Sequence, residues 1–198
     1  MTAQETIDLD LYLRDLSALV ARGFRLPRDD SPTVELSRRF LVNTWETCRD
    51  GLLAKTKRIR VWPDSPIWPQ AFRFEVDCPF KAKAGLDASV ELRPGPVRGT
   101  VFYRHDLYAN LRVPSVGVAL DPSLDYFHPN FSVRYNLICL GELPRGPFPL
   151  DCLLENHLYP ILTYQNRRPS HPANFEAAQY FALDPEAMVG LEPVEPLY

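Results

Sequence analysis

The spacing of apolar residues in this 198-residue chain changes after Lys55, and this change constrains the fold more than any other feature. Before Lys55, apolar residues recur at helical spacing in residues 7–20 and 33–53, which predicts two helices. After it, prolines interrupt the chain, and apolar residues alternate in short runs that are typical of strands. We expect four strands, at residues 72–76, 88–94, 100–111 and 115–120. The short links between these strands favour a four-stranded antiparallel meander.

Helical patterns return in the last quarter of the chain. Residues 150–162 place their leucines and isoleucine on one face, which predicts a helix packed on the sheet, and Pro160 should kink or end it. The stretch "NFEAAQYFAL" predicts a last short helix that begins behind Asn174 as its N-cap. Residues 121–149 have no clean period, so we expect a long irregular loop there.

These elements predict the α+β fold class, with one main domain at residues 33–183. A helical extension, residues 1–32, precedes this domain. An acidic, proline-containing tail, residues 184–198, follows it and should be loose.

The composition of the chain limits which partners and which cellular compartment we expect for it. The net charge of −3 gives no broad basic field, so nucleic acid is not an expected partner. No apolar run approaches the roughly 20 residues of a membrane span. The polar start "MTAQETIDLD" lacks the order of a secretory signal, and we expect a cytoplasmic protein without a membrane partner. Four widely spaced cysteines without a CxxC pair favour free thiols, with no metal site and no cofactor.

Within the irregular loop, the run His128-Pro129-Asn130 precedes Cys139 by nine residues. A thiol attacks carbonyl carbon readily, and the thioester that results stays reactive toward amines. The Asn130 amide could steady a developing oxyanion or brace the loop, and His128 could bond backbone carbonyls on either side of Pro129. Taken alone, a cysteine between Ile138 and a leucine is more simply a buried apolar residue. The combination of Cys139 with His-Pro-Asn favours a catalytic role for the thiol.

The wider pattern carries a resemblance. "FHPN", a short irregular stretch, "ICLG", a Phe148-Pro149 turn, a long amphipathic helix and "HPANFEAAQYF" together resemble the ubiquitin-conjugating enzymes of the UBC fold. That fold has an N-terminal helix, a four-stranded antiparallel meander, a loop with His-Pro-Asn and the catalytic cysteine, and C-terminal helices. The motifs cover residues 126–181, and the order of elements alone matches over residues 33–120.

The resemblance implies that Cys139 accepts the C-terminus of a ubiquitin-like modifier as a thioester from an activating enzyme. It implies that Asn130 acts in the transfer to an amine of a protein substrate, while His128 and Pro129 shape the loop. His171 lies where such enzymes commonly place an acidic residue beside the cysteine, and a neutral imidazole there could orient or deprotonate the amine. A plain surface residue at a helix boundary is an equal alternative for His171.

The sequence also departs from the family pattern. Gly141 stands where an acidic residue is usual, and the Tyr-Pro-Phe run that normally precedes the loop is missing. This divergence is similar to the bacterial relatives, which accompany an activating enzyme and a modifier, sometimes in antiphage defence.

Two other functions stay open. One is a catalytically inactive UBC-like or RWD-like binding module that retains Cys139. The other is a cysteine hydrolase, which needs His128 or His171 within hydrogen-bond reach of the sulfur. His105 and His157 are interpreted as structural, because each lies in a predicted strand or helix with no evident partner.

Overall fold

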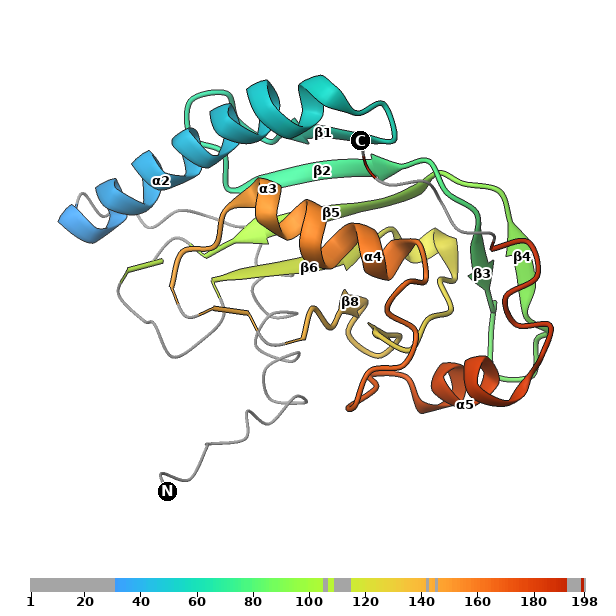
Figure 1. Ribbon diagram of the computed structural model, residues 1–198. Coiled ribbons are helices and arrows are strands. Elements are labelled where there is room, and N and C mark those ends of the chain that lie inside the picture. Colours follow the sequence, from blue (N-terminus) through green and yellow to red (C-terminus); the bar gives the residue numbers. More distant parts are fainter. Residues whose placement is uncertain are drawn as a thin grey trace.

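The computed structural model of the protein describes residues 31–104, 107–108, 115–141, 143–144, 146–191 and 197 (Figure 1). Its main sheet is antiparallel throughout and has six strands in the order β1-β2-β5-β6-β8-β7. Helices pack against this sheet, so the predicted α+β class is confirmed. The helix predicted at residues 7–20 lies outside the described residues.

The first four strands of the main sheet are an antiparallel meander, but one of them differs from the expected set. They are β1 (Ile59–Pro63), β2 (Ala71–Val76), β5 (Val97–Tyr103) and β6 (Val116–Leu120). The strand expected at residues 88–94 is not among them. Its only regular part, β4 (Glu91–Arg93), pairs with β3 (Phe80–Ala82) in a separate two-stranded sheet. Glu91 and Leu92 are exposed, so this strand has no buried face with which to join the main sheet.

Strand β1 was not predicted because prolines lie at its end and just after it, at positions 63, 66 and 69. It is an edge strand that ends at Pro63, and the edge of a sheet tolerates a residue without a backbone N–H. Strand β5 begins at Val97, before the expected start at residue 100, and pairs with β2 from its first residue.

The helix predicted at residues 33–53 is confirmed as α2 (Pro32–Cys48), which continues into the π-helical turn η1 (Arg49–Leu53). Pro32 stands in its first turn, where a missing N–H costs nothing. Its buried side chains recur every three or four positions, at Val34, Ser37, Leu41, Thr44 and Cys48. The Leu150 N–H donates to Thr44 Oγ1 over 2.7 Å, which links α2 to the helical segment that begins at Leu150.

The central helical run crosses one face of the main sheet, in front of β5 and β6 (Figure 1). It comprises α3 (Leu150–Leu153), the π-helical η3 (Leu154–Leu158) and α4 (Tyr159–Leu162). The run ends at Leu162, two residues beyond Pro160. The wider π-helical turn immediately before Pro160 gives the ring room that a regular turn would not.

The last helix, α5 (Phe175–Leu183), begins where the sequence predicted. The Ala177 N–H donates to Asn174 Oδ1 over 3.0 Å, so Asn174 is the N-cap. The segment that follows is not loose in its described part, which corrects the expectation for the tail. Ala187, Leu191 and Leu197 are buried because their apolar side chains pack on the core.

The irregular loop of residues 121–149 is interrupted by regular pieces. They are the short 3₁₀ helix η2 (Pro122–Leu124) and the hairpin strands β7 (Phe131–Ser132) and β8 (Leu137–Ile138). Strands of two residues are too short to show alternation, so the sequence did not reveal this hairpin. Within the described part of the chain, no helix combines the length and apolar content needed to cross a bilayer.

Candidate active site

The β7–β8 hairpin explains the nine-residue spacing of the motif. Phe131 pairs with Ile138, and Ser132 pairs with Leu137. The next pair outward is Asn130 with Cys139, and the Cys139 N–H donates to the Asn130 carbonyl over 2.6 Å. The hairpin register therefore sets the residue after His128-Pro129 directly opposite the cysteine.

The Asn130 side chain closes a second bond to the same residue. Its Nδ2 donates to the Cys139 carbonyl oxygen over 3.1 Å, and the residue is 2% exposed. Its Oδ1 has no hydrogen-bond partner among the described residues. Of the two roles expected for this amide, the geometry favours bracing the backbone of Cys139. An oxyanion could receive the Nδ2–H only after that bond had opened.

The His-Pro-Asn turn is held by the imidazole in an unexpected way. His128 Nδ1 accepts the Asn130 N–H over 2.9 Å, whereas bonds to carbonyls beside Pro129 were expected. The Phe131 N–H donates to the His128 carbonyl, which closes the turn around Pro129. An accepting Nδ1 requires a neutral ring with its hydrogen on Nε2.

Burial explains why the His128 ring stays neutral. The ring is 0% exposed and packs on Tyr126 and Tyr164, with ring centroids 5.9 and 4.7 Å away. Desolvation of the imidazolium lowers the pKa of His128 to about 3. His128 therefore acts as an uncharged structural acceptor at neutral pH.

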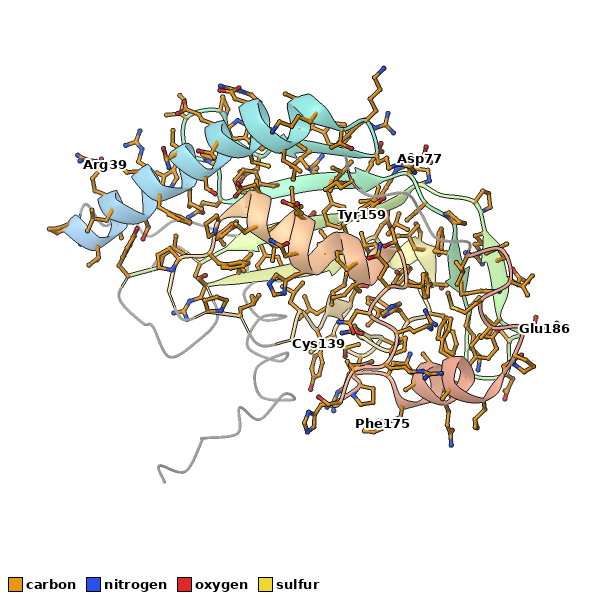
Figure 2. The ribbon with its side chains drawn as sticks, viewed as in Figure 1. Arg39, Asp77, Cys139, Tyr159, Phe175 and Glu186 are labelled. Carbon is orange, nitrogen blue, oxygen red and sulfur yellow. The ribbon has the colours of Figure 1, made fainter. Side chains whose placement is uncertain are left out.

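Cys139 follows β8 at the margin of the core and is 9% exposed. Figure 2 shows it below the central helix, on the side of the molecule that carries α5. Burial raises the pKa of the Cys139 thiol, and a hydrogen bond from the Gly141 backbone N–H opposes part of that rise. Cys48 and Cys78 are buried more completely, and burial raises the pKa of each to about 12. Cys139 thus differs from these two thiols in its greater exposure to solvent.

The segment after Cys139 is tied to the central helix. His157 Nδ1 lies 3.3 Å from the Leu140 carbonyl oxygen. A carbonyl can only accept, so Nδ1 is the donor in this pair. The sequence alone favours a structural His157 without an evident partner, whereas its ring contacts the residue next to Cys139. Seventeen residues separate the pair in the chain, and no local pattern signals such a contact.

His171 lies in the loop that returns to the His-Pro-Asn turn. The Asn174 N–H donates to the Pro129 carbonyl over 3.0 Å, which joins this loop to the turn. His171 is exposed, three residues before Asn174 and within about 10 Å of it along an extended chain. Its Nδ1 shares a hydrogen bond with Ser170 Oγ at 3.1 Å. Among the described residues, neither His171 nor His128 is hydrogen-bonded to the Cys139 sulfur, so a hydrolase dyad gains no support.

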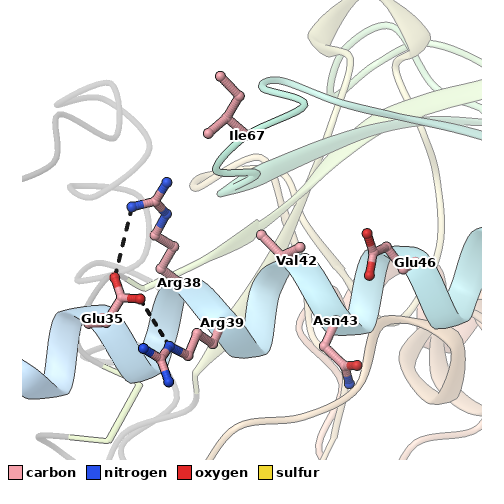
Figure 3. Close-up of a pocket in the computed structure, with 7 residues that line it drawn as sticks. All are labelled: Glu35, Arg38, Arg39, Val42, Asn43, Glu46 and Ile67. Atoms are coloured by element: carbon pink, nitrogen blue, oxygen red, sulfur yellow. Dashed lines mark hydrogen bonds and ion pairs between the residues drawn. The ribbon is translucent and has the colours of Figure 1, made fainter.

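A hollow in the molecular surface lies away from Cys139. It measures about 480 Å³ on the outer face of α2 beside Ile67, and none of the motif residues lines it (Figure 3). Glu35 pairs there with Arg38 at 3.8 Å and with Arg39 at 3.0 Å. The hollow holds no nucleophile, so Cys139 remains the candidate for covalent chemistry.

In the parts of the chain that the structure covers, no three His, Cys, Asp or Glu side chains are grouped to bind a metal ion. No known family model matches this chain, and no curated protein matches it significantly in sequence. The residues of the site itself are therefore the basis for a functional assignment.

Proposed function

We propose that this protein is a ubiquitin-conjugating-enzyme-like transferase with a UBC-like fold. The observation that carries the proposal is the pairing of Asn130 with Cys139 through two hydrogen bonds at the end of the β7–β8 hairpin. This pairing places the asparagine and the cysteine of the motif next to each other, as a shared catalytic site requires. The order of helix, four-stranded meander, motif hairpin and C-terminal helices supports it further.

The proposed reaction has two acyl transfers. The Cys139 thiolate attacks the carbonyl carbon of the modifier's C-terminal thioester on the activating enzyme. A carbon–sulfur bond forms, and the cysteine of the activating enzyme leaves as a thiolate. An uncharged amine of the protein substrate then attacks the new thioester. A carbon–nitrogen bond forms, Cys139 leaves as a thiolate, and the amine gives up one proton to solvent or to a base.

The other motif residues take positioning roles in this proposal. Asn130 holds the backbone of Cys139 in place during both transfers. His128 and Pro129 shape the turn that presents Asn130. His171 is proposed to orient the attacking amine, because its loop is bonded to Pro129 through Asn174. The divergence at Gly141 favours a bacterial-type conjugation pathway in the cytoplasm, and antiphage defence is the setting we propose.

The test combines the protein with ATP, its cognate activating enzyme and the modifier, followed by a non-reducing gel. We expect an adduct that thiol reductant removes and that Cys139→Ala abolishes. Cys139→Ser should give an ester that resists reductant, because oxygen replaces sulfur in the acyl bond. Cys152→Ala is the matched control, since it removes a partly exposed cysteine and should leave the adduct intact. An adduct that persists in Cys139→Ala would reject the proposal.

A second candidate is a catalytically inactive UBC-like or RWD-like module that binds a partner protein. The observation in its favour is the low exposure of Cys139, at 9%, together with its raised thiol pKa. The same gel separates the two candidates. A module of this kind would bind the modifier or the activating enzyme without ever forming a reductant-sensitive adduct.

A further inference from the structure

The loop between α4 and α5 begins and ends at the His-Pro-Asn turn. At its start, the Tyr164 hydroxyl donates to the Phe127 carbonyl over 3.1 Å. At its end, the Asn174 N–H donates to the Pro129 carbonyl over 3.0 Å. Residues 165–173 therefore form a loop whose two ends are fixed beside the turn that lies opposite the candidate thiol.

The chain around this turn carries positive charge and lacks carboxylates. Residues 126–141 and 156–175 contain three arginines, and neither range contains an Asp or a Glu. These arginines are Arg134, Arg167 and Arg168. The chain as a whole has a net charge of −3, so the surroundings of the motif are opposite in sign to its average.

Two carboxylates next to these ranges are already paired with cations. Asp125 lies 3.5 Å from Arg93 Nη1, and Glu176 accepts a hydrogen bond from Lys83 Nζ. Glu142 lies outside the described residues, and an arginine three residues later offsets its charge in the sequence. The positive charge of the two ranges is therefore not cancelled by these paired neighbours.

The three arginines are available to a partner. Arg134 and Arg168 are exposed, and Arg167 is half-buried. In the described part of the chain, no ion pair joins any of the three to a carboxylate. The Arg134 guanidinium lies 5.1 Å from the centre of the Tyr135 ring, a contact that leaves its N–H groups free to bind an anion.

The arginines lie within reach of a segment that is bound at Cys139. Arg134 stands in the turn of the β7–β8 hairpin, and about 10 Å of strand separates that turn from the cysteine. Arg168 follows the anchored Tyr164 by four residues, so its Cα lies within about 15 Å of that end of the loop. A peptide of a few residues can span such distances, whereas the reacting amine itself need not touch any arginine.

We infer that the basic surface formed by Arg134, Arg167 and Arg168 receives an acidic segment of the protein substrate, in which Asp or Glu residues flank the target amine. The inference rests on the proposed function, because it names the substrate class for the same thiol. Carboxylates of the substrate pair with the guanidinium groups and hold the neighbouring amine close to the thioester. Three arginines on an acidic chain suit a short acidic peptide better than nucleic acid, which binds a broader basic field.

The experiment uses two electrophilic peptides, each with a central lysine whose amine is bromoacetylated. The thiol displaces bromide and forms a carbon–sulfur bond at the place that the target amine would occupy. The acidic peptide has two Glu residues on each side of this lysine, and the neutral peptide has Gln at the same places. The readout is the rate of alkylation at pH 8, followed on the Cys139 peptide by mass spectrometry. The salt concentration is about 0.01 M, where the Debye length is about 30 Å and exposed charges interact strongly.

Two variants with the same change in net charge are compared. The test variant replaces the basic surface with uncharged side chains, as Arg134→Gln, Arg167→Gln and Arg168→Gln. The control variant removes three positive charges from exposed residues in or just before β1 and β2, at the opposite end of the main sheet from β8, as Lys55→Gln, Lys57→Gln and Arg73→Gln. Thermal unfolding of each variant confirms that it is folded.

We expect the acidic peptide to alkylate Cys139 about threefold to tenfold faster than the neutral peptide, the effect of two or three exposed ion pairs. The ratio of the two rates should fall close to one in the test variant and in about 0.5 M salt. The control variant should keep the ratio of the unchanged protein.

Equal rates for the two peptides in the unchanged protein would overturn the inference, as would a ratio that survives in the test variant or a Cys139 that neither peptide modifies. Binding of a single-stranded oligonucleotide that requires the three arginines, without a preference for the acidic peptide, would also overturn it and assign the surface to nucleic acid. The assay needs no activating enzyme or modifier. Its failure is therefore distinguishable from a failure of the transferase proposal, which the adduct gel tests.

Discussion

The buried imidazole of His128 predicts a specific sensitivity to acid. Its pKa falls from the ordinary 6.5 to about 3 in the folded protein, because burial disfavours the charged ring. Between these values the unfolded chain binds a proton that the folded protein does not. Stability therefore decreases as the pH falls from about 6.5 toward 3, and the His128 contribution does not change above neutral pH.

The magnitude follows from the size of the shift. At pH 4.5 the unfolded histidine lies about two units below its pKa, while the folded ring is still almost entirely neutral. At about 1.4 kcal/mol per unit, protonation of the unfolded chain removes about 2.5 kcal/mol of stability relative to pH 7. The ring is 0% exposed, so solvent does not screen this effect. For a domain of this size, such a change is a large fraction of the free energy of unfolding.

The assay is urea unfolding at pH 7.0 and pH 4.5, with His128→Asn as the test variant. Asparagine places an oxygen near the position of Nδ1 and can still accept the Asn130 N–H, but it does not titrate. The variant should be less stable at pH 7 because it loses ring packing. Its free energy of unfolding should decrease between pH 7.0 and pH 4.5 by about 2.5 kcal/mol less than that of the unchanged protein. His171→Asn, which removes an exposed histidine, is the control and should keep the original pH dependence. Equal pH dependence in His128→Asn and the unchanged protein would refute the assignment of the acid effect to His128.

Three further outcomes are expected. The Asn130→Ala variant should still form the thioester at Cys139. The transfer of the modifier from this thioester to free lysine should be at least several-fold slower, because the Cys139 carbonyl loses its donor. An unchanged transfer rate, measured by gel, would contradict this. Thr44→Val should cost about 1–3 kcal/mol in urea unfolding because it leaves the buried Leu150 N–H without its acceptor, while Thr44→Ser should keep most of the stability. In the folded protein iodoacetamide should modify Cys139 well before Cys48, which is 0% exposed, and peptide mapping that finds the reverse order would argue against the accessibility of the candidate thiol.

The helices were predictable because each carries its own local signal. In α2 the buried residues recur at helical spacing, and α5 begins behind an asparagine whose side chain caps it. The strands were harder, since their identity depends on partners far away in the chain. Strand β1 is stable next to its prolines only because it occupies an edge, and the sequence does not say which strand will be outermost.

The candidate site was predictable in its residues and not in its contacts. The motif singled out Asn130 and Cys139, but the register of two-residue strands that pairs them depends on β6, because Leu137 pairs with Ala119. His157 was dismissed because its partner is a backbone carbonyl, and every residue has one. Side-chain contacts with distant backbone leave no trace in composition or spacing, so only the folded chain reveals them.

The site that results is built from uncharged groups. Burial and the Gly141 N–H are the influences on the pKa of Cys139, and no charged side chain among the described residues contributes to it. Asn130 Nδ2 donates to the Cys139 carbonyl, and His157 Nδ1 donates to the carbonyl of the next residue, Leu140. A thiol in such surroundings stays protonated at rest and gains nucleophilicity only when a donor meets its sulfur or solvent reaches it.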